Sequence, residues 1–264
     1  VRKQDDMISH QIDGQSTVYE VDTLKNFVIG SISELKHANH VKSEFLMNMS
    51  HDFRTPVSGI LHMSRFVYQK IEDGKLKKLQ KMTVDSAEQL MTLLEDVLDY
   101  SRLSDNKLQV QAAMFDIIPV VDGVIAFMCP KAHEKSIGIA KHYVEPSLTY
   151  IGDRVILQRI ILNILSNAIK FTNQGCIDVS VNHSFHANQK HLAISIKDTG
   201  IGISEMHLQV IFEPFYRVDP ANSAKHAGIG LGLSNVSLMM KAIGGSVFVT
   251  SKLGEGSEFV LNLP

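Results

Sequence analysis

Asn163, Asn167 and Lys170 are polar residues spaced at i, i+4 and i+7, so they share one face of a predicted helix whose opposite face is apolar. An amide oxygen suits Mg²⁺, which prefers oxygen donors and usually retains waters and substrate phosphates. A lysine adds a point charge that can contact phosphate. The pattern therefore predicts a phosphate and metal site, with a solvated polar helix face as the alternative.

A carboxylate and two glycines follow a predicted strand, at Asp198, Gly200 and Gly202. A carboxylate at a strand end can accept a hydrogen bond from an exocyclic amine, and glycines let a base approach the backbone closely. That chemistry favours adenine over guanine. A glycine turn without a ligand is the alternative.

A third group is the glycine series Gly228, Gly230 and Gly232, which leads through Leu233 into a predicted helix. Glycine backbone N–H groups aligned with a helix N-terminus form an anion cradle, so phosphate is the natural ligand. The spacing is neither the Rossmann nor the P-loop pattern.

Between the second and third groups, residues 212–227 combine aromatic residues with a polar stretch. A lid over a nucleotide requires this combination of anchor and flexibility. Arg217 lies in this segment and is placed to reach a phosphate.

These residues need a mixed scaffold to bring them together. Short alternating runs predict half-buried strands, and 3.6-residue periodicity predicts helices. Mixed helices and hairpin-like strands indicate an α+β sandwich, which we expect to span residues 112–264. The predicted strands are 177–181, 192–196, 246–250 and 258–263, and the predicted helices are 118–135, 155–171 and 232–243.

The preceding residues 41–104 predict two amphipathic helices joined by a turn at 72–74. The apolar stripe of this antiparallel hairpin is too extensive to remain in water, and self-association of two hairpins into a four-helix bundle would cover it. In the first helix, His51 lies about 140° from the centre of the apolar stripe and so faces outward. We expect residues 1–40 to be a linker, with a possible signalling helix from Val21.

The overall composition excludes several classes of protein. The chain has 26 Lys and Arg against 28 Asp and Glu, a net charge of −2, which argues against a nucleic-acid binder. The chain has two cysteines, Cys129 and Cys176, which are too few for a disulfide framework or a four-cysteine zinc site. Their small number indicates a reducing cellular compartment. We expect both thiols to be buried. No apolar run is long enough for a membrane span. A chain that begins with Val1 is expected to be a fragment of a longer protein.

The ordered set of these groups, with Gly254-Glu255-Gly256-Ser257 near the end, resembles the catalytic and ATP-binding domain of sensor histidine kinases. That domain has the GHKL (Bergerat-type) α/β-sandwich fold of gyrase and Hsp90 ATPases. Residues 45–56, FLMNMSHDFRTP, resemble the phosphoacceptor box of the dimerisation and histidine-phosphotransfer domain. The resemblance covers residues 41–264.

The resemblance implies a role for each matching position. His51 would accept the phosphoryl group, Asp52 would orient and deprotonate the imidazole, and Thr55 would support regulator dephosphorylation. Ile229 stands where the family usually has Thr or Ser, so a lid hydroxyl is absent. In the second domain the resemblance implies Mg²⁺ ligation by Asn163, phosphate contacts from Asn167 and Lys170, adenine selection by Asp198, and a nucleotide cradle at Gly200, Gly202, Gly228, Gly230 and Gly232.

The function expected from this resemblance is ATP-dependent autophosphorylation of His51 and transfer to an aspartate of a response-regulator receiver domain. The protein would be a cytoplasmic homodimer whose cofactors are ATP and Mg²⁺, without nucleic acid and without membrane contact in this region. A membrane anchor upstream in the parent protein is the alternative for its location. An ATPase of the same fold and an ATP-binding pseudokinase scaffold are the two alternatives. His183, His186 and His191 are expected to be solvated loop residues and not metal ligands.

Overall fold

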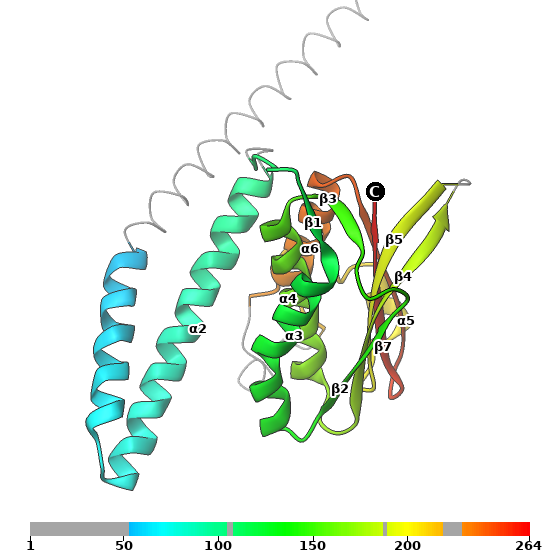
Figure 1. Cartoon of the computed structure of the whole chain (residues 1–264). Coiled ribbons are helices and arrows are strands. Elements are labelled where there is room, and N and C mark those ends of the chain that lie inside the picture. Colours follow the sequence, from blue (N-terminus) through cyan, green and yellow to red (C-terminus); the bar gives the residue numbers. More distant parts are fainter. Residues whose placement is uncertain (1–52, 105–107, 187–188, 219–228) are drawn as a thin grey trace, which may run out of the picture. The chain divides into compact units, whose positions relative to one another are not determined.

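The computed structural model describes residues 53–104, 108–186, 189–218 and 229–264 (Figure 1). Within these ranges, no helix has the length and apolarity needed to cross a bilayer. A helix of residues 53–70 is followed by α2 (Gly74–Ser104), and the remaining elements alternate between helices and strands. They are β1 (Ala113–Asp116), α3 (Ile117–Glu134), β2 (Gly138–Tyr143), β3 (Thr149–Gly152), α4 (Arg154–Phe171), β4 (Cys176–His186), β5 (Gln189–Asp198), α5 (Glu205–Leu208), α6 (Gly232–Ala242), β6 (Ser246–Lys252) and β7 (Gly256–Leu263).

The first two helices form the predicted antiparallel hairpin. Asp73 caps the start of α2, because its Oδ1 accepts hydrogen bonds from the N–H groups of Lys75 and Leu76, both at 2.9 Å. Across the hairpin, Arg65 Nη2 lies 2.6 Å from Glu88 Oε1. The turn and this ion pair fix the register of the two helices.

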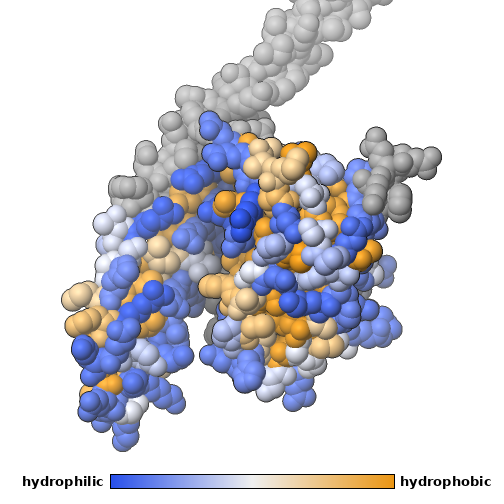
Figure 2. Space-filling view, viewed as in Figure 1, coloured by the Kyte–Doolittle hydropathy of each residue, from blue (hydrophilic) through white to orange (hydrophobic). Residues whose placement is uncertain are grey.

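Many apolar side chains of the hairpin remain exposed. Figure 2 shows hydrophobic side chains among the hydrophilic ones on the hairpin surface. A single hairpin cannot bury both sides of its apolar stripe, because each helix contacts only one neighbour. We call the following residues the exposed hairpin face: Phe53, Ile60, Met63, Phe66, Val67, Leu76, Leu79, Met82 and Leu90.

The second domain contains a five-stranded sheet in the order β2-β4-β5-β7-β6. Strands β2 and β4 are parallel, and the other neighbours are antiparallel. A separate antiparallel pair, β1 and β3, brings Met114 opposite Ile151. Helices α3, α4 and α6 cover one face of the larger sheet (Figure 1). This is the predicted α/β sandwich.

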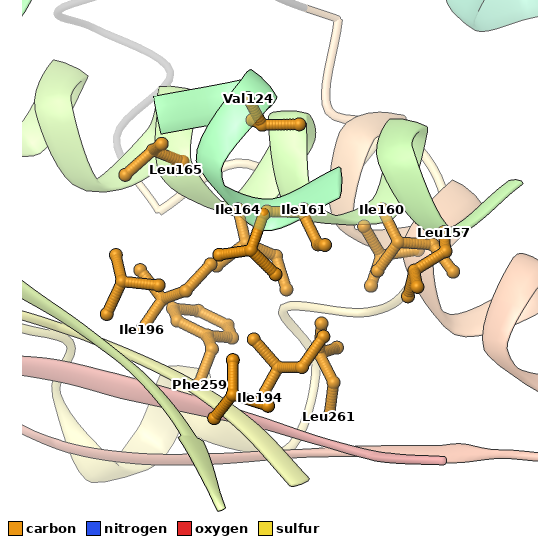
Figure 3. Close-up of a cluster of buried hydrophobic side chains, with 14 of the residues drawn as sticks. Val124, Leu157, Ile160, Ile161, Ile164, Leu165, Ile194, Ile196, Phe259 and Leu261 are labelled. Atoms are coloured by element: carbon orange, nitrogen blue, oxygen red, sulfur yellow. The ribbon is translucent and has the colours of Figure 1, made fainter. Parts of the chain in front are cut away.

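The core lies between the helices and the sheet. Figure 3 shows side chains from α4, including Leu157, Ile161 and Ile164, between the helix and Ile194 and Leu261 of the sheet. These five side chains are completely inaccessible to solvent. Their burial anchors α4 along its length, so the opposite polar face of the helix has a fixed orientation toward the site.

Several local expectations were wrong. Cys129 and Cys176 are both exposed, because Cys129 lies on the outer side of α3 and Cys176 at the first position of β4. His183 and His191 lie in strands and not in a loop, because the β4–β5 hairpin is longer than its apolar alternation indicated. Strands β1, β2 and β3 were not predicted, since they are short and lack a clear alternating pattern.

Candidate nucleotide-binding site

The polar face of α4 forms one wall of the site. Asp153 caps this helix, with its Oδ1 accepting from Val155 N at 2.9 Å and Ile156 N at 3.1 Å. Asn163 and Asn167 are half-buried one turn apart, and Asn167 Nδ2 donates to Asn163 Oδ1 at 3.4 Å. The two amides therefore occupy one stretch of the helix surface, as their spacing predicted.

The glycine-rich series approaches this wall at the start of α6. A Cβ on Gly232 would lie 2.8 Å from Asn163 Oδ1, so a larger residue at this position would push the Asn163 amide aside. Gly230 has φ of 81°, a backbone conformation that favours glycine. Leu233 packs against the hydrophobic core and so anchors the first turn of α6. Gly228 lies outside the described residues.

Two cationic side chains lie near the C-terminal end of α4. Burial lowers the pKa of the Lys170 ammonium, and the nearby charges of Arg217 and Lys131 lower it further. The Lys170 ammonium also lies 4.9 Å from the centroid of the Phe171 ring. Positive charge gathered in a partly desolvated place is favourable for an anion, so Lys170 and Arg217 suit phosphate groups.

Asp198 lies at the end of β5 and is 6% exposed. Burial raises the pKa of its carboxyl, while hydrogen bonds from the backbone of Gly200 and Ser257 act in the opposite direction. Gly200 N donates to Asp198 Oδ1 at 2.8 Å, which fixes one carboxylate oxygen within the turn.

An open pocket of about 480 Å³ adjoins this turn. Its lining mixes polar and apolar groups and includes two side chains that the sequence motifs did not single out, Asn173 and Gln174. Its lining residues are Asn173, Gln174, Thr199, Gly200, Ile201 and Gly254.

The donor set fits ATP and Mg²⁺. Asn163 offers an amide oxygen, and Mg²⁺ needs few protein ligands when phosphates and waters supply the rest. Gly232, at the start of α6, lies against this amide. The first N–H groups of a helix have no partners within the helix, which suits them to phosphate.

The predicted phosphoacceptor lies outside this part of the structure. His51 and Asp52 are not among the described residues. Thr55 is exposed on the helix of residues 53–70. The structure therefore brings together the α4 and α6 residues, and gives no contact between them and Thr55.

Three contacts between α2 and the nucleotide-site elements were not predicted. Arg159 of α4 binds Asp99, and Asn235 Nδ2 of α6 donates to the Asp96 carbonyl at 2.9 Å. The third is an edge-to-face contact between Tyr100 and Phe215, with ring centroids 5.9 Å apart. The acidic residues of α2 are visible in the sequence. Their partners lie 60 and 139 residues further along the chain, so only the tertiary fold shows which residues they contact.

Two known families match successive parts of the chain. Residues 41–106 match the His Kinase A (phospho-acceptor) domain. Residues 152–264 match the histidine kinase-, DNA gyrase B- and HSP90-like ATPase family. The fold and site therefore define an ATP-binding domain of the GHKL class attached to a phosphoacceptor hairpin.

Curated relatives match nearly the whole chain. The autoinducer 2 sensor kinase/phosphatase LuxQ of Vibrio vulnificus (strain YJ016) is 32% identical over 96% of this chain and 30% of its own length. The sensor histidine kinase GacS of Pseudomonas protegens is 34% identical over 97% of this chain and 29% of its own length. The signal transduction histidine-protein kinase BarA of Escherichia coli K12 is 34% identical over 96% of this chain and 28% of its own length. The chain thus spans about a third of the length of these relatives.

Solved structures show the same architecture. Full-length ShkA in complex with AMPPNP has a TM-score of 0.69 and 34% identity, covering 84% of this chain and 45% of that one. The Acinetobacter baumannii histidine kinase AdeS shares the fold, with a TM-score of 0.56 and 22% identity over 81% of this chain and 96% of that one. This chain belongs to the sensor histidine kinases and corresponds to their transmitter region.

Proposed function

We propose that this chain uses ATP to phosphorylate His51 and passes the phosphoryl group to an aspartate of a response-regulator receiver domain. The observation that carries the proposal is the close approach of Gly232 to Asn163, which joins the amide face of α4 to the glycine-rich start of α6. It occurs in a chain whose residues 41–106 match a phosphoacceptor family.

Each site residue has a role in this proposal. Asp198 accepts a hydrogen bond from the adenine amine, and Lys170, Arg217 and Asn167 contact the phosphates. Asn163 holds Mg²⁺, which when bound neutralises phosphate charge. Catalysis of phosphoryl transfer depends mainly on positioning and electrostatic stabilisation, which these residues supply.

His51 is the nucleophile of the proposed reaction. Its neutral imidazole, with an ordinary pKa near 6.5, has a free nitrogen lone pair at pH 7. That nitrogen forms a bond to the γ-phosphorus as the bond to the bridging oxygen breaks, and ADP leaves with the electron pair. Asp52 accepts the proton from the other ring nitrogen. We place the reaction in the cytoplasm, because its substrate ATP is a metabolite of the cell interior.

The exposed hairpin face supports a homodimer. Two hairpins packed as a four-helix bundle would remove these apolar side chains from water. Met63→Glu together with Met82→Glu should convert dimers to monomers in light scattering. Gln69→Glu, about 120° around the first helix from Met63, is the matched control and should leave dimers intact. A wild-type chain that is monomeric at all concentrations would reject this part of the proposal.

Labelling with γ-³²P ATP tests the reaction. The proposal predicts acid-labile, alkali-stable phosphate on the protein, absent in His51→Gln, while that variant still binds ATP. Released phosphate without labelled protein would instead indicate an ATPase, and nucleotide binding without either product would indicate a signalling scaffold. Loss of both labelling and ATP binding in His51→Gln would contradict the role given to this histidine.

We further propose that Thr55 supports dephosphorylation of the receiver. Thr55 follows His51 by four residues, a spacing that in a helix corresponds to about 40° around the axis, so the sequence predicts that both share one face. Thr55→Ala should slow loss of phosphate from a phosphorylated receiver and leave autophosphorylation unchanged. An equal decrease in both rates would reject a separate role.

A further inference from the structure

The side chain of Lys135 reaches from the end of α3 to the end of α4. Its Nζ donates to three backbone carbonyls, those of Ile169 at 2.7 Å, Lys170 at 2.9 Å and Thr172 at 3.2 Å. The last carbonyls of a helix have no partners within the helix, and a cation there also interacts favourably with the helix dipole. Lys135 is thus a C-terminal cap of α4 supplied by a different element.

The backbone that carries Lys135 is itself fixed. Ser136 N donates to His133 O at 2.9 Å, and Ile137 N donates to Ala132 O at 3.0 Å, which closes the end of α3. Ile137 is 5% exposed and is part of the hydrophobic core. The ammonium therefore extends from a rigid point, so its three bonds fix α4 relative to α3.

The one carbonyl in this stretch that Lys135 does not contact faces the nucleotide site. Phe171 O accepts a hydrogen bond from Ile201 N at 3.2 Å, and a Cβ on Gly200 would lie 2.6 Å from the same oxygen. Gly200 N in turn donates to Asp198 Oδ1. The carbonyls of residues 169–172 are therefore divided between Lys135 on one side and the Asp198 turn on the other.

We propose that Lys135 is a positioning residue for the nucleotide site. It holds the last turn of α4 so that Lys170 faces the phosphates while Phe171 O holds the turn that carries Asp198. The inference rests on the proposed nucleotide-binding role of these residues. Lys135 itself makes no contact with the nucleotide.

Lys135→Met, Lys135→Arg and the control Lys141→Met test this role in the full chain. Lys141 also makes an ion pair, with Asp122 at 2.7 Å, but it lies on β2 and contacts no residue of the site. Equilibrium binding of ATP should weaken about tenfold in Lys135→Met, because both phosphate and adenine contacts shift. Lys135→Arg should restore binding to within about threefold, since a guanidinium also donates to several acceptors.

A second measurement does not involve nucleotide. Hydrogen exchange of the Ile201 amide in the free protein should become at least tenfold faster in Lys135→Met and remain unchanged in Lys141→Met. If Lys135→Met does not fold, Lys135→Gln, which keeps a donor, replaces it. Unchanged Ile201 exchange and unchanged ATP affinity would overturn the inference and leave Lys135 a stabilising cap. Failure of the wild-type chain to bind ATP would refute the proposed function instead, while the exchange result would still decide whether Lys135 positions the turn.

Discussion

One guanidinium nitrogen of Arg159, Nη1, donates to both carboxylate oxygens of Asp99, at 2.7 Å and 2.8 Å. The pair joins α4, which carries the asparagines of the candidate site, to α2 of the hairpin. Arg159 lies four residues before Asn163, so the ion pair is one helical turn from the proposed metal ligand. The ion pair is therefore a direct contact between the hairpin and the helix that carries the site asparagines.

The Arg159–Asp99 pair should contribute modestly to stability. A double-mutant cycle of Arg159→Gln and Asp99→Asn, measured by urea unfolding, should give a coupling free energy of about 0.5 kcal/mol, because the arginine is largely exposed. The coupling should decrease between low salt and 1 M salt as the charges are screened. A coupling that does not change with salt would contradict an electrostatic origin.

Asp96 should make stability depend on pH. Burial, with the nearby charges of Asp99 and Glu95, raises the pKa of its carboxyl from 3.8 to about 6. The folded state therefore binds its proton more tightly than the unfolded state, and this contribution to stability is lost as pH rises through about 6.

Asp96→Asn removes that charge and should stabilise the chain at pH 8 by about 1 kcal/mol, after discounting for partial exposure. The gain should become smaller at pH 5, where the wild-type carboxyl is largely protonated. Thermal unfolding at both pH values measures the difference in stability between the variant and the wild-type chain. Asp85→Asn, at an exposed position of the same helix, is the control. A gain of the same size at both pH values would show that the Asp96 charge is not its cause.

Ser136 has φ of 58°, in the left-handed region that is unfavourable for a residue with a side chain. Ser136→Gly should therefore increase the free energy of unfolding by about 0.5 to 1 kcal/mol. Ser136→Ala keeps the Cβ and should show no such gain. Urea unfolding of the three proteins compares them, and a destabilised Ser136→Gly would disprove the argument from backbone strain.

Gly232→Ala should weaken ATP binding at least tenfold, because the added Cβ would lie 2.8 Å from Asn163 Oδ1 and displace the amide. Gly123→Ala is the matched control, since a Cβ there has no atom within 4 Å. In the interior of α3 it should stabilise the fold by about 0.5 to 1 kcal/mol without changing ATP affinity. Calorimetric titration with ATP distinguishes the two variants, and equal affinities would rule out the proposed Asn163 contact.

Much of the architecture followed from local pattern. The predicted helix of residues 155–171 and the observed α4 differ by one residue at the start, and the observed sheet strands include all four predicted ones. Long apolar repeats specify which face of an element is buried, and a polar face at positions 163, 167 and 170 then follows from helical geometry. Short strands such as β1 carry too few residues for a detectable period.

The amino-acid sequence by itself determined the hairpin helices, the longer helices and strands of the second domain, the amphipathic faces and the residue chemistry that suits a nucleotide. Only the tertiary structure decided that Gly232 meets Asn163, that Lys135 caps a helix 34 residues further along the chain, and that Asp96, Asp99 and Tyr100 contact the second domain. Local propensity acts over a few residues, whereas these contacts depend on how separate elements pack around one core. Packing between elements is a property of the whole fold and leaves no periodic signal in the chain.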